Sequence, residues 1–500
     1  MRFDLHMGTF VDTALRPDHD AVIGADRTLT WQALAQEAAA WCVQARAAGF
    51  AADVPVIIRG HKEAAFFVAI AGALMLGAPF VPLDTIYPDE RMDRIARTLG
   101  THAYYDARTA TFERLPHASS PQPLQEKGLA YVLFTSGTTG EPKGVQIGRE
   151  SVHTLVEWMA RDFALGTAPV FLNQAPFSFD LSMYEVMATL ALGGSVVLAS
   201  REAITQGDAF LKTLAVHGVT TWVSTPSFAQ QQLLQPAFSG QGLPTLDTFL
   251  FCGEVLPVTL ARHLRQRFPK ARIINTYGPT EATVATTWIV VDDAMLAGAD
   301  KLPIGYPKRG SEVFVQDGEL CIAGPHVMRG YLNREDLNAT RMFAHNGTRG
   351  FRTGDLGAVD AHGRLFCHGR IDDQVKVGGY RIELMEIDAA LGKLPGVQNA
   401  AAVPLRRPDG SVARIVGFVQ PVSGGGQLPL EVPLQLPFPP QDWKASLGEA
   451  LPPYMVPSEL IPWPTLPVSV NFKIDRAKLA EDYRDMQRNP IRHTERERNG

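Results

Sequence analysis

Tyr131–Gly144 reads YVLFTSGTTGEPKG, an apolar run that passes directly into hydroxyl groups, glycines and a lysine. Its first four residues, Tyr131 to Phe134, predict a buried strand. Glycines let backbone N–H groups turn towards phosphate oxygens, and the hydroxyls and Lys143 add donors and charge. The spacing is not that of a Walker loop, because Gly140 lies three positions before Lys143 and a glycine follows the lysine. The stretch therefore favours a polyanion-binding loop, although a polar surface turn uses the same residue types.

The composition is that of a soluble globular protein. Of the 500 residues, 45% are hydrophobic and 20% are charged, and the length is too great for one ordinary core, so at least two domains are expected. A net charge of −5 gives no electrostatic reason to expect nucleic acid as a partner. The four cysteines are too far apart for C-x-x-C, so neither a zinc site nor a disulfide framework is indicated. This usage favours a reducing compartment, and we expect the cytoplasm.

The uncharged run from Ala64 to Leu83 is long enough to cross a bilayer. Glycines and prolines interrupt its second half, and its first half has apolar residues at helical spacing. We therefore predict a buried helix followed by a strand near Pro79, and no membrane insertion. Asp4 and His6 stand where a signal peptide would have its apolar core, so secretion is not expected.

Alternating helix and strand patterns fill residues 1–130. Thr30 can cap a helix that begins at Trp31, Val54–Ile58 has the pattern of a buried strand, and Pro88 precedes acidic residues typical of a first helical turn. Strands separated by helices predict a largely parallel sheet covered on both faces, and therefore an α/β fold.

Asp180 is an acidic residue inside an apolar stretch. It lies between Phe179 and Leu181, where we expect a helix to begin. Aspartate often caps helices, and a partly buried carboxylate can instead bind a cation; the residues alone leave both readings open. Cys252 ends another predicted strand, and no base stands next to it in sequence, so we interpret it as pocket lining and not as a nucleophile.

The loop at Tyr131–Gly144 resembles the phosphate loop of the adenylate-forming enzymes, a family of acyl-CoA synthetases, luciferases and peptide-synthetase adenylation domains. Four further motifs continue the resemblance at that family's spacing: Asn275–Glu281 (NTYGPTE), Phe351–Asp355 (FRTGD), Gly369–Glu383 (GRIDDQVKVGGYRIE) and Asn471–Asp475 (NFKID). The resemblance implies a large N-terminal adenylate-forming domain of mixed sheets and helices over residues 1–371. A small, mobile α+β C-terminal domain would follow over residues 372–500 and carry the catalytic lysine.

The resemblance also implies a site for ATP. The residues that it assigns to ATP are Thr135, Ser136, Gly137, Thr138, Thr139, Gly140, Lys143, Gly253, Glu254, Asn275, Thr276, Tyr277, Gly278, Asp355 and Arg370. Tyr277 would stack on adenine, Asn275 would contact the edge of that base, and Asp355 would hold both ribose hydroxyls through its two acceptor oxygens.

Three residues receive catalytic roles from the resemblance. Lys473 would bridge the reacting anions, Thr280 would contact the α-phosphate, and Glu281 would help to hold Mg²⁺, a hard cation that prefers oxygen ligands. Asp372 would be the hinge between the domains. The last motif departs from the family because Phe472 replaces a glycine; a positive φ there would strain the loop by about 1–2 kcal/mol.

The amino-acid-activating members of the family place an Asp at the position of Asp180 to bind the substrate's α-ammonium group. Four stretches are similar to one group of these members, the D-alanine–D-alanyl carrier protein ligases: Gln174–Ser182, Ser224–Phe228, Phe251–Pro257 and Asn275–Ala285. The implied pocket is lined by Leu181, Tyr184, Val223, Cys252, Thr276 and Val284. Such a pocket leaves room for a methyl side chain, but apolar contacts separate substrates by only about 1–3 kcal/mol per methylene, so glycine, serine and L-alanine stay open.

The resemblance thus implies a freestanding, monomeric, ATP-dependent and AMP-forming ligase. It would activate a small amino acid, D-alanine first among the candidates, and transfer it to the phosphopantetheine thiol of a separate carrier protein. A peptide-synthetase-type enzyme for another small amino acid is one alternative. An acyl- or aryl-CoA synthetase is a second, against which Asp180 argues. A non-catalytic nucleotide-binding relative is a third, against which Lys473 and Glu281 argue, together with Asp355 and Arg370.

Overall fold

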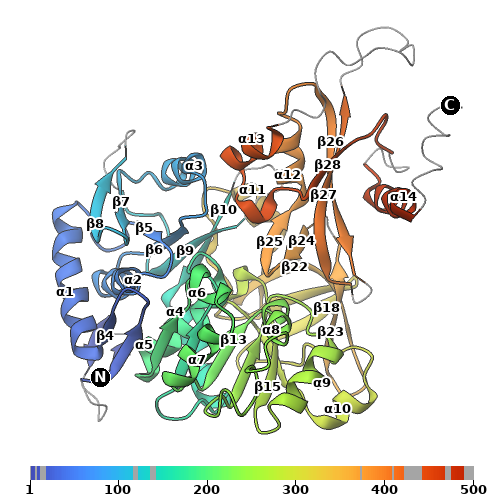
Figure 1. Ribbon diagram of the computed structural model, residues 1–500. Helices are drawn as coiled ribbons and strands as arrows, with labels where there is room; N and C mark the ends of the chain where they lie inside the picture. The colour runs from blue at the N-terminus through green and yellow to red at the C-terminus, as the bar shows by residue number, and fades with distance from the viewer. Residues whose placement is uncertain are drawn as a thin grey trace, which may run out of the picture. The chain divides into compact units, whose positions relative to one another are not determined.

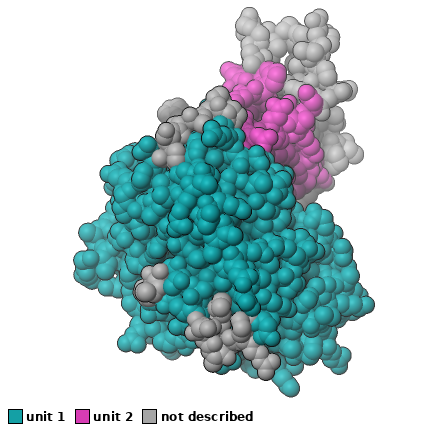
Figure 2. All heavy atoms as spheres, turned by 90° about the vertical axis from the view of Figure 1, so that its left-hand side faces the viewer, with its two compact units in different colours: residues 1–85, 93–135, 143–372 teal, residues 86–92, 136–142, 373–500 magenta. Residues whose placement is uncertain are grey.

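The computed structural model describes residues 2–5, 8–11, 18–115, 122–135, 142–371, 374–407, 410–421, 442–467 and 474–488. The chain forms two compact units, coloured separately in Figure 2. Unit 1 comprises residues 1–85, 93–135 and 143–372, and unit 2 comprises residues 86–92, 136–142 and 373–500. The expected hinge Asp372, the expected catalytic residue Lys473 with its neighbour Phe472, and Ser136–Gly140 of the expected phosphate loop lie outside the described residues.

A seven-stranded sheet of unit 1 contains the strand that leads into the phosphate loop. In spatial order its strands are β20 (Gly330–Tyr331), β10 (Lys143–Gly148), β9 (Leu129–Thr135), β6 (Phe80–Asp84), β5 (Val56–Gly60), β7 (Ala103–Asp106) and β8 (Thr111–Arg114). The four strands β9, β6, β5 and β7 run parallel, and the others pair antiparallel at the two edges. Tyr131–Phe134 is fully buried within β9, which confirms the predicted strand.

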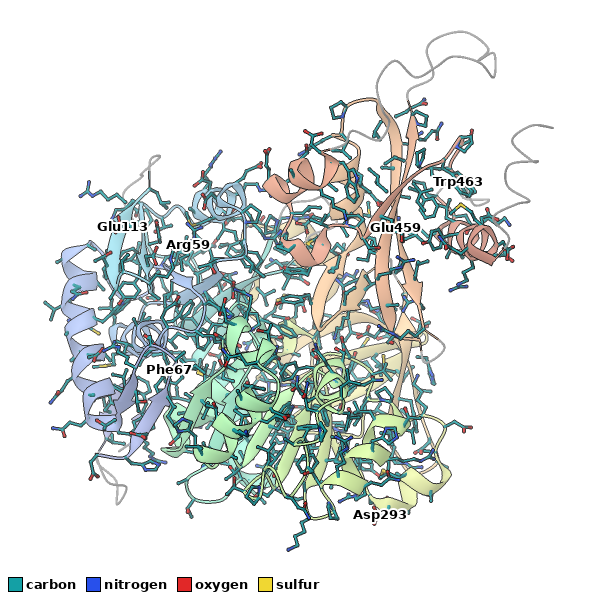
Figure 3. All side chains as sticks on the ribbon, in the orientation of Figure 1. Arg59, Phe67, Glu113, Asp293, Glu459 and Trp463 are labelled. Carbon is teal, nitrogen blue, oxygen red and sulfur yellow. The ribbon has the colours of Figure 1, made fainter. Side chains whose placement is uncertain are left out.

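The helix and strand expected between Ala64 and Leu83 are confirmed. α2 (Ala64–Leu76) packs against α1 (Trp31–Ala47), and β6 follows it. The two helices approach so closely that a Cβ on Gly72 would lie 2.5 Å from the Trp41 ring. Figure 3 shows Phe67 of α2 surrounded by other side chains, whereas Glu113 and Asp293 lie at the periphery. No helix in the described part of the chain is long and apolar enough to cross a membrane.

Other local predictions for the N-terminal region also hold. The Thr30 hydroxyl accepts a hydrogen bond of 3.2 Å from the Ala33 amide and caps α1. α3 (Asp89–Leu99) begins with two acidic residues directly after Pro88. β5 begins at Val56, two residues later than expected.

A nine-stranded sheet forms the second layer of unit 1. In spatial order its strands are β17 (Tyr306–Pro307), β16 (Thr287–Val290), β15 (Arg272–Tyr277), β14 (Thr248–Phe251), β13 (Thr221–Ser224), β11 (Val170–Asn173), β12 (Ser195–Leu198), β3 (Asp20–Ile23) and β4 (Thr28–Thr30). The six strands from β15 to β3 run parallel. Successive side chains of a strand point to opposite faces. Leu250 and Ile274 accordingly join one buried core, and Phe249 and Ile273 join another, so both faces are covered.

Two helices lie between these sheets (Figure 1). α4 (Arg149–Asp162) contacts β9 and β10, α5 (Met183–Leu192) contacts β11 and β12, and the two helices pack on each other. The other helices of the parallel-sheet region are α6 (Arg201–Thr205), α7 (Asp208–Val216), α8 (Pro226–Gln232), α9 (Val258–Arg267) and α10 (Asp293–Gly298). Two short 3-10 helices, η1 (Asp180–Ser182) and η2 (Thr280–Ala282), carry residues expected to function.

The remaining elements of unit 1 are mostly antiparallel strands. They are β1 (Arg2–Asp4), β2 (Thr9–Val11), β18 (Glu312–Gln316), β19 (Glu319–Ala323), β21 (Met342–His345), β22 (Thr348–Val359), β23 (Leu365–Arg370) and the helix α11 (Glu335–Arg341).

Unit 2 is an α+β arrangement with its own core. Its elements are β24 (Gln374–Val377), β25 (Tyr380–Glu383), α12 (Leu384–Leu391), β26 (Val397–Arg406), β27 (Val412–Pro421), α13 (Trp443–Ala450), η3 (Pro453–Met455), β28 (Glu459–Pro462) and α14 (Arg476–Arg488). Side chains on one face of the β26–β27 pair join a core with α12, and those on the other join a core with α14.

Candidate active site

The candidate site of unit 1 lies where parallel strands of the nine-stranded sheet end. Val223 lies near the end of β13, Cys252 directly follows β14, and Asn275, Thr276 and Tyr277 end β15. A Cβ on Gly253 would lie 3.5 Å from the Phe179 ring, so the residues before Asp180 lie beside the end of β14. The carboxyl edge of a parallel sheet is where ligands bind in open α/β folds.

Asp355 links two other residues that the resemblance assigns to ATP, Tyr277 and Arg370. The Tyr277 hydroxyl donates to Asp355 Oδ2 at 2.5 Å, and Arg370 Nη1 donates to Asp355 Oδ1 at 3.0 Å and to the Thr353 carbonyl at 2.9 Å. Asp355 and Arg370 are direct partners in the β22–β23 ladder. Burial, with the negative charge of Asp355, raises the pKa of Tyr277 well above its usual value.

Other residues assigned to ATP already have partners within the protein. Asn275 is buried, and its amide donates to the Pro303 carbonyl at 2.8 Å. The Thr276 hydroxyl donates to the Phe251 carbonyl at 2.8 Å, and Glu254 accepts from the Ser227 amide at 3.1 Å. Their contacts with a nucleotide remain predictions.

Tyr331 is a functional candidate that the sequence did not reveal. Its hydroxyl donates to Glu281 Oε1 at 2.5 Å, and the ammonium of Lys143 lies 5.7 Å from the centre of its ring. All three residues are buried. Glu281 belongs to η2, Lys143 begins β10 and Tyr331 lies on β20, so 50 or more residues separate Tyr331 from each partner in sequence. Because of that separation, the sequence alone does not show that Tyr331, Glu281 and Lys143 lie together.

Thr135 and Lys143 are opposite each other in the β9–β10 ladder and flank the phosphate loop. The Thr135 hydroxyl is buried and has no hydrogen-bond partner in the structure as described. Buried polar groups are normally hydrogen-bonded, so an orphaned hydroxyl beside a glycine-rich loop is a candidate ligand group. Thr280 begins η2 and is half-buried.

Asp180 is buried and begins η1, but it is not the N-cap residue of that helix. The N-cap is Phe179, and neither η1 nor α5 has a side-chain capping hydrogen bond at its N-cap. Burial, followed by the charge of Asp180, raises the pKa of Tyr131 well above its usual value. The Tyr131 hydroxyl is itself buried, with no hydrogen-bond partner among the described residues. A carboxylate at the start of η1 and an orphaned hydroxyl on β9 therefore lie near each other.

The apolar residues expected to line the pocket share one buried core. They are Leu181, Tyr184, Val223, Cys252 and Val284. The Tyr184 hydroxyl donates to the sixth expected residue, Thr276, at 3.1 Å, and the Cys252 thiol lies 3.7 Å from the Val284 carbonyl oxygen. Burial raises the pKa of Tyr184 well above its usual value.

The turn that contains Val284 has an unusual backbone. Thr283 and Val284 have φ values of 54° and 69°, in the left-handed region that β-branched residues avoid. Each such residue costs about 1–3 kcal/mol and persists only where its surroundings hold it. The turn also approaches Gly278 closely, because a Cβ at position 278 would lie 2.4 Å from Ala285 Cα. Only glycine fits at that position without a backbone shift.

A second group of buried charges, also missed by sequence reasoning, lies next to the residues that precede Asp180. Lys62 donates to Asn173 Oδ1 and to the Ala175 carbonyl, and Asn173 Nδ2 donates to Glu185 Oε1 at 3.2 Å. Burial lowers the pKa of Lys62 to about 7 and raises that of Glu185 to about 8. Lys62 lies two residues before the start of the uncharged run, but nothing in the sequence places it beside Asn173.

The acidic groups of the described residues do not form a metal site on their own. No group of three His, Cys, Asp or Glu side chains in the described ranges could hold a metal ion. Glu281 provides a buried carboxylate, the ligand type that Mg²⁺ takes together with substrate phosphates.

Comparison with known proteins identifies the family. The sequence pattern of the AMP-binding enzyme family matches residues 11–111 and 101–332. A D-alanine–D-alanyl carrier protein ligase of Bacillus velezensis is 33% identical over 504 residues, which cover 95% of this chain and 98% of the relative. A protein of the same name from Bacillus licheniformis is 34% identical over 495 residues, which cover 93% and 97%.

The fold has solved counterparts. The structure of a Vibrio cholerae adenylation domain in complex with glycyl-adenosine-5'-phosphate superposes with a TM-score of 0.79 at 22% identity. The superposition covers 94% of this chain and 95% of that structure, which shows that the two share a fold. Given the family match and the full-length relatives, the chain belongs to the AMP-binding enzyme family.

Proposed function

We propose that this enzyme activates a small amino acid, D-alanine first among the candidates, with ATP and transfers it to the phosphopantetheine thiol of a separate carrier protein. The observation that carries the proposal is the buried Asp180 carboxylate among apolar walls at the carboxyl edge of the sheet. The Bacillus relatives, at 33–34% identity over most of this chain, bear the name of that activity. We expect a cytoplasmic monomer.

The reaction has two steps. In the first, the substrate carboxylate attacks the α-phosphorus of ATP, and the bond to pyrophosphate breaks. In the second, the carrier thiol attacks the carbonyl carbon of the aminoacyl-adenylate, loses its proton, and AMP leaves. The enzyme must hold two anions together and stabilise the charge that develops on phosphorus.

The proposed site has two halves. The nucleotide half consists of the loop from Thr135 to Lys143 and of seven further residues: Gly253, Glu254, Asn275, Tyr277, Gly278, Asp355 and Arg370. Asp355 accepts from Tyr277 and Arg370, which orients its carboxylate for the ribose hydroxyls. The orphaned Thr135 hydroxyl supports a phosphate position beside it.

The amino-acid half consists of Asp180 with the lining residues Leu181, Tyr184, Val223, Cys252, Thr276 and Val284. Asp180 would pair with the substrate ammonium, and the Tyr131 hydroxyl nearby would gain a polar partner. Tyr184 is fixed by its hydrogen bond to Thr276, so the pocket stays small.

Glu281, oriented by Tyr331, would hold Mg²⁺, which when bound neutralises charge on the ATP phosphates. Thr280 at the start of the same 3-10 helix would contact the α-phosphate. Lys473 would bridge the carboxylate and phosphate in the first step. Rotation of the small domain, residues 372–500, about Asp372 would then remove Lys473 and admit the thiol.

Amino-acid-dependent exchange of pyrophosphate into ATP tests the first step. We expect exchange with D-alanine, weaker exchange with L-alanine, glycine and serine, and its loss in Lys473→Ala. Thioester formation from preformed aminoacyl-adenylate should survive that substitution much better. Equal loss of both half-reactions would contradict the role of Lys473.

The choice of thiol acceptor tests the second step. We expect the adenylate to be transferred to a holo-carrier protein and not to coenzyme A. Efficient transfer to coenzyme A, with acids that lack an ammonium group, would contradict the proposal and favour an acyl-CoA synthetase.

A further inference from the structure

The left-handed turn at Thr283–Val284 is held from outside by two buried residues to which the proposed chemistry gives no role. They are Lys308, which is 1% exposed, and His326, which is fully buried. Both lie in unit 1, and more than 20 residues separate each from the turn in sequence. A strained conformation needs such support from its surroundings.

Lys308 bonds directly to the turn. Its ammonium donates to the Ala285 carbonyl at 2.7 Å, and its backbone amide donates to the Thr286 carbonyl at 2.8 Å. The ammonium also lies 4.9 Å from the centre of the Trp158 ring. Burial lowers the pKa of Lys308 well below its usual value. Burial of an amine beside a carbonyl and an aromatic face costs desolvation free energy. That cost favours a specific role for Lys308 over simple filling of the core.

His326 bonds to the turn through both its backbone and its ring. The Thr283 hydroxyl donates to the His326 carbonyl at 2.6 Å, and the Thr286 hydroxyl shares a hydrogen bond of 3.0 Å with His326 Nε2. The other ring nitrogen, Nδ1, lies 3.2 Å from the Ser311 hydroxyl. Burial, and after it the charge of Lys308, lowers the pKa of His326 well below its usual value, so the ring is neutral. Thr283 and Thr286 are thus anchored on either side of Val284.

The turn and its supports contact the amino-acid half of the site. The Cys252 thiol lies 3.7 Å from the Val284 carbonyl oxygen. The Trp158 ring beneath Lys308 lies 6.4 Å from the ring of Tyr184. Lys308 therefore touches the turn on one side and, through Trp158, the wall formed by Tyr184 on the other. No hydrogen bond described for Lys308 or His326 leads to Asp355 or Arg370.

We propose that Lys308 and His326 are positioning residues that hold the Thr283–Val284 turn in its left-handed conformation and thereby set the affinity and selectivity of the amino-acid pocket. The inference rests on the proposed function, because it takes Val284 as a wall of that pocket. It assigns neither residue a contact with the reacting atoms.

Lys308→Met tests the role of the ammonium, because it removes the donor and keeps the length of the side chain. We expect the KM for D-alanine in pyrophosphate exchange to rise about tenfold, as for a lost buried hydrogen bond. The preference for D-alanine over glycine should fall, while the KM for ATP changes less than about twofold. Lys301→Met is the matched control, since Lys301 also donates to a backbone carbonyl, that of Cys367, away from the turn. Equal changes in both KM values of Lys308→Met would overturn the proposal.

Relief of the backbone strain distinguishes the loss of support for the turn from a general packing defect. Glycine adopts positive φ without steric penalty. Thr283→Gly removes the hydroxyl that bonds to His326, but it also removes the steric penalty of positive φ. In the Lys308→Met background it should therefore lower the raised KM for D-alanine by at least about threefold. Failure of the double variant to recover any affinity would show that Lys308 does not act by holding this backbone.

Thr286→Val provides a milder variant if Lys308→Met does not fold, because it removes the hydrogen bond to His326 with little change in volume. The amino-acid KM should rise about three- to fivefold with the ATP KM unchanged. Wild-type values for both substrates would overturn the proposal. Absence of any amino-acid-dependent exchange by the wild-type enzyme would instead refute the proposed function itself.

Discussion

Side-chain hydrogen bonds between residues of regular strands connect the nucleotide half of the proposed site, whereas short 3-10 helices and a left-handed turn shape the amino-acid half. Asp355 on β22 accepts from Tyr277 at the end of β15 and from Arg370 at the end of β23. Asp180 begins a helix of three residues, and Val284 has a φ of 69°. Three residues of the first half thus bond to one another, whereas the turn of the second half bonds to Lys308 and His326, which lie outside that half.

This difference has a consequence for substitution. In the proposed nucleotide half, Tyr277 and Arg370 bond to Asp355, so a change there should affect one substrate. In the amino-acid half, Lys308 bonds to the turn that contains Val284, and Lys62 bonds to the segment before Asp180. Precision in a binding site needs such supporting contacts. Specificity for the acid substrate should therefore be sensitive to residues that never touch it.

Removal of the Asp180 carboxylate should have the largest effect. Loss of one partner of a buried ion pair costs about 3–5 kcal/mol, so Asp180→Ala should reduce alanine affinity by about two to three orders of magnitude. The KM for ATP should stay nearly unchanged, because no residue of the nucleotide half is altered. Pyrophosphate exchange at varied alanine and ATP concentrations measures both. Full alanine activity in the variant would mean that Asp180 has only a structural role.

Asp355→Asn should weaken ATP binding and leave binding of the amino acid nearly unchanged. Hydrogen bonds to a charged group contribute about 1.5–3 kcal/mol, so the KM for ATP should rise about ten- to 100-fold while the KM for alanine changes little. Asp360→Asn is a matched control, because Asp360 follows the same strand and pairs with Arg364 at 2.7 Å. An unchanged KM for ATP in Asp355→Asn would show that Asp355 does not belong to the ATP site.

Gly278→Ala should affect both halves together. Its Cβ would lie 2.4 Å from Ala285 Cα, so the backbone after Tyr277 and the turn after Val284 must move apart. Such overpacking costs about 1–3 kcal/mol of stability. Both KM values should rise, and chemical denaturation should show the loss of stability. Gly298→Ala is the control, because a Cβ there meets nothing within 4 Å. A wild-type KM for either substrate would show that the two halves are independent at this point.

Glu185→Gln should have the smallest effect, which is a change in how the stability of the protein depends on pH. Because burial raises the pKa of Glu185 from 4.5 to about 8, the folded state holds a proton that the unfolded state releases, and stability falls as pH rises through this window. Glutamine does not titrate, so the stability of wild type relative to the variant should fall between about pH 5 and 8. Thermal unfolding of both proteins, with exposed Glu335→Gln as a control, measures the difference. A difference that does not change with pH would contradict the raised pKa.

Elements with strong local signals could be predicted from the sequence. The run from Ala64 to Leu83 folds as helix and strand because its glycines and prolines mark where the helix must end. The capping hydroxyl of Thr30 marks the start of α1. The ATP motifs contain Tyr277, Asp355 and Arg370, and the fold brings these three together.

The supports of the amino-acid half could not be predicted, because their partners are distant in sequence. Lys308 and His326 are 22 or more residues from the groups of the turn that they bind, and lysine is among the residues least often buried. Positive φ at Thr283 and Val284 contradicts the local preference of β-branched residues, and only tertiary contacts make it possible. Tyr331 is close to Glu281 only because β20 pairs with β10. Local patterns carry none of this information.

The central claim is that the acid substrate is recognised by its ammonium group, and comparison of alanine with propionate in the wild-type enzyme tests it most directly. The two acids differ by that group alone. We expect D-alanine to support pyrophosphate exchange with a kcat/KM at least about 100-fold above that of propionate, in proportion to the loss of a buried ion pair. Propionate activity should not fall further in Asp180→Ala. Equal use of the two acids by wild type would contradict the account, and the enzyme would then be one that activates simple carboxylic acids.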